Sequence, residues 1–469
     1  MKLLWYISNI YANSGYSDEA RVFVDELINR KIDVKIIGRN NKKGSEKYIF
    51  QKENNPGTPI IFHTYRHGDY EIYRDQYSIA RTMLEVSRIP QAWVYKLNEM
   101  DEVWIPNKFN YNSFINSGVK RDKLFIIPSP VDFSYSNESS IFQFKSKKRF
   151  KLLSIFNYGV RDRKGFDILL KAYIETFSQK DDVCLVIKTK SSIEDIRREY
   201  NLIGNVPEIE IINKIIKRNE LLSIYRGVNC FVLPSRGEGI GRTYLDALMM
   251  GVPIIATGWS GNTDFLNKEN SFLIKYKLID IEKKHFLKYP GFYGSKWAEP
   301  DVEDLKKIMK FVYNQFSVAR KKGEKGKKDV LKFKKENTVK SVIERLGNPL
   351  LKNIHEKGCL NLFERLFPIY YPDINSFSEV SQRNRKDFKK NINSCLIYGK
   401  GKAFKRAINF IKNGIGIRQV YSCDVDFNLF NKLEYQFDII VIAENVTGLN
   451  VAYKNLIKNI DTVPIYVFY

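Results

Sequence analysis

The chain has 469 residues, of which 43% are hydrophobic and 14% aromatic. That length suits about three domains, and so much apolar surface excludes the intrinsically disordered, collagen-like and coiled-coil classes of protein. Lysine and arginine number 77 against 53 aspartates and glutamates, a net charge of +24. This excess favours an anionic partner, such as a nucleic acid, an acidic lipid headgroup or a phosphorylated small molecule.

The cysteines and the apolar runs point to the compartment. The five cysteines are far apart and include no C-x-x-C pair, so neither a disulfide framework nor a zinc knuckle is expected, and a reducing cytoplasm fits. The first apolar run, MKLLWYISN, is too short for a signal-peptide core. No stretch approaches the roughly 18 apolar residues of a membrane span. We therefore expect a cytoplasmic protein that is at most peripheral at the inner face of the membrane.

Short apolar runs alternate with amphipathic helical segments from the first residue to about 348, as is typical of parallel α/β domains. The first series of expected strands is KLLWYIS, VKIIG, PIIFHTY, DEVWIP and KLFIIP. A helix is expected over residues 17–30, where the apolar side chains fall mostly on one side. The polar stretch 134–148 then interrupts the alternation and predicts a domain junction.

A second series of strands follows the junction and comprises KLLSIF, VCLVIK, IEIIN, CFVLPS and PIIAT. Two such sheets in tandem predict two Rossmann-like domains, residues 1–140 and 141–347, that face each other across a cleft. Ligands of these sheets bind beyond the carboxyl ends of the strands, so we expect the functional site in that cleft.

A strongly basic stretch closes the second series. Residues 321–340 carry nine lysines against Glu324, Asp329 and Glu336 on a helical pattern. This pattern is either a solvated helix face or a contact with an anionic surface.

The last residues, 348–469, are predicted to form a linker and an additional Rossmann-like module. Gly399 and Gly401 follow an apolar strand as in a dinucleotide fingerprint, but Phe404 stands in place of its third glycine. The module therefore binds a nucleotide or serves a structural or interaction role.

The segment FVLPSRGEGIGRTYLDALMMGVPIIATGWSGNTDFL, residues 231–266, carries the strongest functional signal. A buried strand is followed by a glycine-rich turn that contains Glu238, and Asp246 lies in the helix after it. The glycines of the turn let a ligand approach the backbone, and the amides at the start of the helix suit a diphosphate. Carboxylates beside such a site suit sugar or ribose hydroxyls, each charge-assisted bond being worth roughly 1.5–3 kcal/mol.

This segment resembles the E-x7-E signature of the retaining glycosyltransferases with the GT-B fold, specifically family 4. Supporting matches run along most of residues 1–347, namely SGYSDEAR, RTMLEVSRIPQAWVYKLNEMDEVWIPNKFN, NYGVRDRKGFDILL and KWAEPDVEDLKKIM. The resemblance implies a GT-B architecture, with the acceptor side in the first domain, the nucleotide-sugar donor on the second, and a small α/β domain appended.

The resemblance also implies roles for matching residues. Glu238 would contact hydroxyls of the transferred sugar, and Asp246, where the family usually has Glu, would bind the nucleotide ribose. Lys164 would grip the donor diphosphate, and Arg161 and Arg163 compete for the role of an arginine that usually precedes that lysine. Further residues implied around the donor are Gly15, Gly239, Ile240, Gly241, Arg242, Thr243 and Asp264.

Three residues of the first domain are expected on the acceptor side. His63 ends an apolar strand, so it points into the cleft or is a buried, satisfied histidine. Trp93 is a sugar platform or a core residue, and Glu85 belongs to the same matching segment. In the second domain, Asp264 either hydrogen-bonds a donor hydroxyl or caps the turn that follows it.

No metal or other cofactor is expected. The four histidines, His63, His67, His285 and His355, show neither H-E-x-x-H nor facial-triad spacing. The D-x-D motif at residues 424–426 has too few residues after it for the acceptor domain of the other glycosyltransferase architecture. Preorganised cations and amides would stabilise the departing nucleoside diphosphate instead.

The residues and the resemblance together predict a metal-independent transferase of a hexosyl or related sugar, from a nucleotide-sugar donor to a hydroxyl of a glycan, a lipid-linked or a protein acceptor. The resemblance, and not the spacing of residues, implies that the enzyme is retaining. It would act in bacterial surface glycan or glycoprotein biosynthesis, with no nucleic-acid partner. No opposed carboxylate pair is identifiable, which favours same-face attack over a covalent intermediate. The alternatives are a basic protein that binds nucleic acid or an anionic surface, and a non-catalytic GT-B subunit. The nucleotide base, the sugar, the acceptor and the oligomeric state are not identified.

Overall fold

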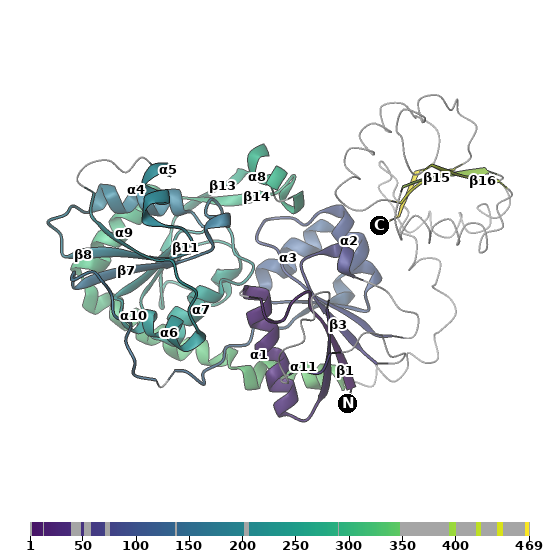
Figure 1. Cartoon of the computed structure of the whole chain (residues 1–469), viewed down its shortest axis with the longest axis horizontal. Helices are drawn as coiled ribbons and strands as arrows, with labels where there is room; N and C mark the ends of the chain where they lie inside the picture. Colours follow the sequence, from purple (N-terminus) through teal and green to yellow (C-terminus); the bar gives the residue numbers. More distant parts are fainter. Residues whose placement is uncertain are drawn as a thin grey trace. The chain divides into compact units, whose positions relative to one another are not determined.

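The computed structural model describes residues 2–38 except 13, 48–50, 58–70, 76–288 except 137 and 201–205, 290–347, and the four strands 394–399, 419–423, 439–443 and 465–468 (Figure 1). The chain divides into two compact units, Met1–Glu356 and Lys357–Tyr469. Among the helices that the structure describes, none is both long and apolar enough to cross a bilayer.

The first unit begins with a six-stranded parallel sheet in the order β2-β1-β3-β4-β5-β6. Its strands are β1 (Lys2–Tyr6), β2 (Asp33–Ile37), β3 (Ile60–His63), β4 (Ser78–Arg81), β5 (Glu102–Ile105) and β6 (Leu124–Ile126). The connecting helices include α1 (Gly15–Asn29), α2 (Gln91–Glu99) and α3 (Lys108–Ser117). The sequence pattern predicts five of these strands and misses β4, because its residues SIAR include a serine and an arginine among only four.

A second six-stranded parallel sheet follows, in the order β12-β11-β10-β7-β8-β9. Its strands are β7 (Phe150–Ile155), β8 (Val183–Lys188), β9 (Glu208–Ile212), β10 (Cys230–Leu233), β11 (Ile254–Thr257) and β12 (Phe272–Ile274). Its helices include α4 (Phe166–Thr176), α5 (Ile193–Glu199), α6 (Arg218–Arg226) and α7 (Arg242–Met249). All residues of β10 and β11 are buried, as is typical of parallel sheets whose two faces are covered by helices.

These two sheets confirm the expected α/β class with two Rossmann-like sheets. In the first sheet the strand order reverses between β1 and β3, and in the second it reverses between β7 and β10. A crevice opens outside the carboxyl ends of the strands at such a point, which makes it the usual ligand site of the fold. The predicted junction, residues 134–148, joins the sheets, and its described residues form no helix or strand.

An antiparallel hairpin extends from the second sheet to the first, and we call residues 276–300 the arm. It contains β13 (Tyr276–Asp280), α8 (Lys283–Lys288) and β14 (Lys296–Pro300). Ile281, Phe292 and Trp297 of the arm are buried in the same apolar cluster as α2 of the first sheet. The backbone N–H of Ser87 also donates to the carbonyl of Lys296 at 3.0 Å. The arm therefore joins the two sheets, which the sequence pattern does not predict.

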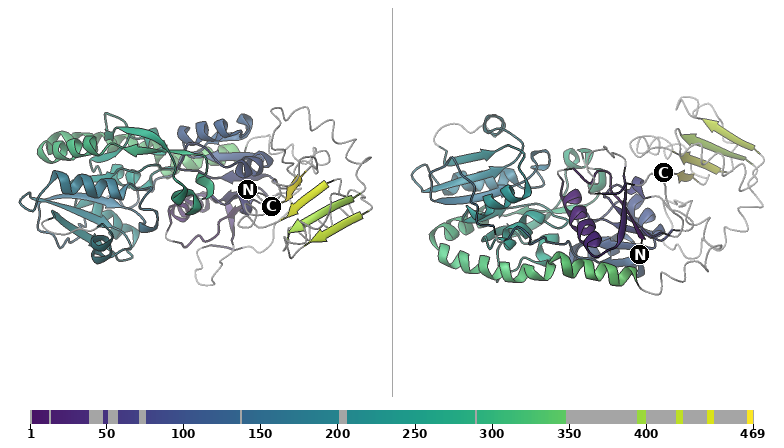
Figure 2. Two further views of the ribbon diagram at one scale, coloured as in Figure 1. Left: turned by 90° about the horizontal axis from the view of Figure 1, so that it is seen from above. Right: turned by 60° about the horizontal axis from the view of Figure 1, so that its bottom comes forward.

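Three helices, α9 (Val302–Asn314), α10 (Phe316–Asp329) and α11 (Lys335–Leu346), complete the first unit. Val339, Val342 and Leu346 of α11 are buried in the apolar cluster of the first sheet, and α11 lies against α1. The green helices therefore run from one sheet to the other (Figure 2). The sequence pattern assigns residues 141–347 to the second domain, whereas α11 at the end of this range packs on the first sheet. The sequence pattern shows the apolar stripe of α11 but not which core the stripe contacts.

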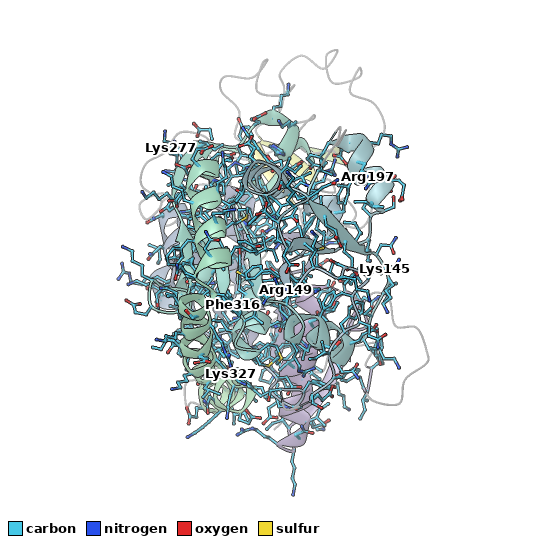
Figure 3. The ribbon with its side chains drawn as sticks, turned by 90° about the vertical axis from the view of Figure 1, so that its left-hand side faces the viewer. Lys145, Arg149, Arg197, Lys277, Phe316 and Lys327 are labelled. Atoms are coloured by element: carbon cyan, nitrogen blue, oxygen red, sulfur yellow. The ribbon has the colours of Figure 1, made fainter. Side chains whose placement is uncertain are left out.

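The lysine-rich stretch 321–340 is split between α10 and α11 by a 3₁₀ turn over Val330–Phe333. Figure 3 looks at the side of the molecule along which α10 runs, with Phe316 and Lys327 of that helix labelled. Part of the charge is paired, since Lys325 contacts Asp329 and Lys335 contacts Asp132.

The second unit contains a four-stranded parallel sheet in the order β16-β15-β17-β18. Its strands are β15 (Ser394–Gly399), β16 (Gln419–Cys423), β17 (Ile439–Ala443) and β18 (Ile465–Phe468). The remainder of the incomplete dinucleotide fingerprint, the D-x-D motif and His355 lie outside the described residues.

Candidate active site

The loops after β7 and β10 bring Lys164 and Glu238 together. These two strands are neighbours at the point where the second sheet reverses its order, so their carboxyl ends adjoin. The Nζ of Lys164 donates to both carboxylate oxygens of Glu238, at 2.6 and 2.9 Å. Glu238 is buried, and its backbone N–H donates to the Oγ of Ser260 at 2.9 Å. A cation and a carboxylate thus meet where the fold normally binds a ligand.

Burial and charge act in opposite directions on this pair. Burial alone would raise the pKa of Glu238, but the charges of Lys164 and Arg163 outweigh it and hold the pKa below its usual value. Burial lowers the pKa of Lys164, against the opposing effect of the Glu238 charge. Glu238 is therefore an ionised acceptor near neutral pH and a weak base.

Arg163, not Arg161, reaches Glu238. The guanidinium of Arg163 donates to the carbonyl of Gly237 at 2.7 Å and lies 3.8 Å from Glu238 and 3.3 Å from Glu85. Arg161 instead pairs with Glu199 of α5 and stacks on the ring of Tyr158. Of the two arginines expected to compete for this role, the structure places Arg163 beside the carboxylate and Arg161 against α5.

The helix α7 starts beside this pair. Gly241, which precedes it, has a φ of +86°, a left-handed conformation that favours glycine. The first backbone N–H groups of an α-helix have no acceptor within it, and the helix dipole places positive charge at this end. Ile240, Gly241 and Arg242 therefore form a backbone suited to a phosphate. The hydroxyl of Thr243 is buried and has no partner within the described part of the chain.

Arg242 extends from α7 to the first sheet. Its guanidinium lies 3.1 Å from the Oγ of Ser129. A Cβ placed on Gly15 would lie 3.7 Å from the Cδ of Arg242. The start of α1 therefore faces the start of α7, and the expected approach of Gly15 to a donor stays a prediction.

The glycine turn is approached by the first domain. A Cβ on Gly237 would lie 2.0 Å from the carbonyl oxygen of Glu85, and one on Gly239 would lie 2.8 Å from Met83. The side-chain amides of Asn107 and Asn110 both donate to the carbonyl of Gly239, at 2.5 and 2.9 Å. The glycines were expected to admit a ligand. In this structure the backbone of Gly237 and Gly239 instead contacts residues of the first domain.

Asp264 belongs to the same contact between the sheets. Its Oδ2 accepts from the backbone N–H of Lys108, the first residue of α3, at 2.7 Å. Burial raises the pKa of Asp264. Of the two expected roles the structure shows a cap, but the helix that it caps belongs to the opposite domain.

His63 and Trp93 are both buried. The Nε2 of His63 lies 2.9 Å from Glu19, with both side chains fully inaccessible, and burial lowers the pKa of His63. Trp93 packs with Val94 and with Phe292 of the arm in the core under α2. Neither side chain is exposed to a substrate, so the structure places both in the interior rather than on the acceptor side.

Asp246 is held by a residue that the sequence did not indicate. The two terminal nitrogens of Arg218 donate to its two oxygens, at 2.7 and 2.5 Å. Asp246 lies one turn into α7, and Arg218 is the first residue of α6. No spacing rule connects residues 28 positions apart on different helices, so only the fold reveals the pair.

Among the described residues, no three or more His, Cys, Asp or Glu side chains are grouped so that they could hold a metal ion.

Comparisons with known proteins match one segment of the chain and its fold. Residues 149–281, which include Lys164, Glu238 and Asp246, match the family model described as "Glycosyl transferases group 1". The structure of Anabaena Alr3699/HepE in complex with UDP and glucose superposes with a TM-score of 0.55 at 11% identity, over 74% of this chain and 99% of that one. The fold is that of GT-B glycosyltransferases.

Two curated relatives match the chain in part. The lipopolysaccharide core biosynthesis mannosyltransferase LpsB of Rhizobium meliloti (strain 1021) is 30% identical over 101 residues, which are 21% of this chain and 29% of that protein. The capsular polysaccharide biosynthesis glycosyltransferase CapM of Staphylococcus aureus is 26% identical over 117 residues, or 24% of this chain and 30% of that protein. The chain thus spans less than a third of the length of these relatives, although its GT-B fold extends over both sheets.

Proposed function

We propose that the protein is a retaining glycosyltransferase that moves a sugar from a nucleotide-sugar donor to an acceptor hydroxyl. The observation that carries this proposal is the contact of Lys164 with the buried Glu238, beside the start of α7. The match of residues 149–281 to the glycosyltransferase family supports it. So does the GT-B fold, which has a solved example with UDP and glucose bound.

Each group has a distinct task in this reaction. A departing nucleoside diphosphate carries negative charge, which the first amides of α7 and the side chains of Lys164 and Arg163 would stabilise. The ammonium group of Lys164 has three donors, and two of them contact Glu238, so one is left for a phosphate oxygen. Glu238 would accept hydrogen bonds from hydroxyls of the sugar.

The charge state of Glu238 favours same-face attack. A carboxylate whose pKa is held below its usual value by adjoining cations is a poor base and a poor nucleophile. In our proposal the leaving phosphate therefore takes the proton of the incoming hydroxyl, and the protein aligns the two reactants. The cations Lys164, Arg163 and Arg242 take the role that a metal would have, which is why we propose a metal-independent enzyme.

The acceptor is a glycan, a lipid-linked or a protein hydroxyl in this proposal. Relatives named for lipopolysaccharide core and capsular polysaccharide biosynthesis favour a bacterial surface polysaccharide. A cytoplasmic location and a contact of the lysines of α10 with an anionic membrane remain predictions.

Release of nucleoside diphosphate from UDP-, GDP- and dTDP-sugars, and of CMP from CMP-sugars, by the full chain tests the function. Glu238→Gln and Lys164→Ala should each lower turnover by at least about 100-fold, since each removes a charge-stabilising group from the reacting centre. The matched controls Glu175→Gln and Lys306→Ala break an exposed ion pair and should retain wild-type turnover. A wild-type chain that binds a donor but turns over none would support the non-catalytic subunit. Unchanged turnover in the two site variants would contradict the assigned roles.

A further inference from the structure

Arg218, the first residue of α6, contacts Asp246, which lies one turn into α7. The two parallel hydrogen bonds hold the carboxylate in the plane of the guanidinium. A carboxylate offers about four acceptor positions, so two remain for other donors after Arg218 has taken two. Asp246 therefore remains able to accept from two neighbouring hydroxyl groups.

The position of the pair along α7 identifies the part of a donor that it would meet. Asp246 lies four residues beyond Arg242, or about 6 Å along the helix at about 1.5 Å per residue, from the amides that suit the diphosphate. Ribose is the group next to the diphosphate in a nucleotide-sugar, and its 2′- and 3′-hydroxyls are two adjacent donors. The spacing thus places a diol beside Asp246.

Arg218 also faces the opposite domain. Burial alone would lower the pKa of its guanidinium, but the charge of Asp246 and, more weakly, that of Asp18 raise it. Asp18 belongs to the first turn of α1, so the charge that acts on Arg218 includes one from the first domain. Tyr225 supports α7 from α6, because its hydroxyl donates to the carbonyl of Thr243 at 3.0 Å. The helices that carry Arg218 and Asp246 are thus joined by a second hydrogen bond.

We propose that Arg218 is a positioning residue that aims Asp246 at the ribose diol and so makes the site select ribonucleotide over 2′-deoxyribonucleotide donors. This inference rests on the proposed function. An aspartate has a shorter reach than the glutamate expected here, and the bidentate contact compensates by fixing the orientation of the shorter side chain. Arg218 thereby acts through Asp246 without touching the reacting atoms.

Calorimetric binding of UDP and GDP against dUDP and dGDP to the full chain tests this inference. The wild type should bind the preferred ribonucleotide about 10- to 100-fold more tightly than its 2′-deoxy form, as expected for one charge-assisted hydrogen bond. Arg218→Ala should reduce this ratio to below about threefold, because it weakens binding of the ribonucleotide and leaves binding of the 2′-deoxy form unchanged. With the matching sugar donor, KM should rise while kcat is preserved.

Two further variants separate positioning from mere support. Arg218→Lys should restore part of the discrimination, because an ammonium group retains the charge but makes a single contact. Arg226→Ala, on the same helix and bonded to carbonyls of residues 135 and 140, should keep the full ratio. If Arg218→Ala is unfolded by circular dichroism, Arg218→Gln provides the same comparison.

Equal weakening of both nucleotide forms by Arg218→Ala would overturn the inference, and so would a wild type that does not discriminate. In both cases the proposed function stands if turnover still depends on Glu238 and Lys164. If the wild type binds no nucleotide and turns over no donor, the proposed function fails together with the inference.

Discussion

The buried carboxylate of Glu19 is stabilised by charged and polar partners on two strands. Its carboxylate contacts Arg81 at the end of β4 at 2.5 Å and His63 at the end of β3 at 2.9 Å, and all three side chains are inaccessible. Burial alone would raise the pKa of Glu19, but the charge of Arg81 and the hydrogen bond of His63 outweigh it and hold the pKa far below its ordinary value. The cluster ties α1 to the carboxyl ends of two strands beneath the site.

Glu19→Gln should destabilise the first domain by about 3–5 kcal/mol at pH 7, because it leaves the charge of Arg81 buried and uncompensated. The folded pKa of Glu19 lies below the unfolded value of about 4.3, so its stabilisation is complete above that pH and is lost on acidification. Denaturant titrations at several pH values should therefore show that the difference in unfolding free energy between wild type and variant becomes smaller towards pH 3.5. Glu26→Gln, which breaks a partly exposed pair with Arg30, should cost about 1 kcal/mol or less. A difference in unfolding free energy that stays constant with pH would contradict this role of the Glu19 charge.

At the scale of residues, the sequence identified two side chains that the fold brings into contact, but it could not decide between adjacent candidates for the same role. Lys164 and Glu238 were identified from their motifs, and the structure brings them into contact. Whether Arg161 or Arg163 accompanies them depends on the rotation of a short loop, which no spacing rule describes. The partner of Asp246 depends on how two helices pack and has no local signal.

The arm is the element that most changes the picture derived from the sequence. Trp297 is 3% exposed and packs in the core of the first sheet, although it lies in the chain beyond the second sheet. Apolar alternation predicted most strands of the two sheets because each is a continuous buried run. The strands β13 and β14 gave no such signal. β13 is largely exposed, and a hairpin that packs on another domain with one face needs apolar residues only on that face.

Trp297→Ala should lower the free energy of unfolding by about 3–5 kcal/mol, as expected when a large buried aromatic side chain is deleted. Leu278 of the same hairpin is 46% exposed, and Leu278→Ala should cost less than about 0.5 kcal/mol. Thermal and denaturant unfolding of the two variants provides the comparison. Equal losses, or no loss for Trp297, would show that the arm does not hold the two sheets together.

For the molecule as a whole, the two sheets contact each other directly at the proposed site. The carbonyl of Gly239 accepts from Asn107 and Asn110, and Asp264 accepts from the first residue of α3. The helix α11 adds a second connection, through the ion pair of Arg345 with Glu102 at 2.6 Å. In our proposal a donor that reaches Lys164 and Glu238 meets the contact at Gly239, and we therefore expect donor binding to be coupled to separation of the two sheets.

The measurement that tests the central claim most directly is a crystal structure of the full chain with the nucleotide-sugar that stabilises it best in a thermal-shift panel. We expect the diphosphate within hydrogen-bond distance of the Nζ of Lys164 and of the amides of Ile240 and Gly241, and the sugar hydroxyls on Glu238. A nucleotide bound at any other place, with the contact of Lys164 and Glu238 intact and no phosphate beside it, would contradict the account.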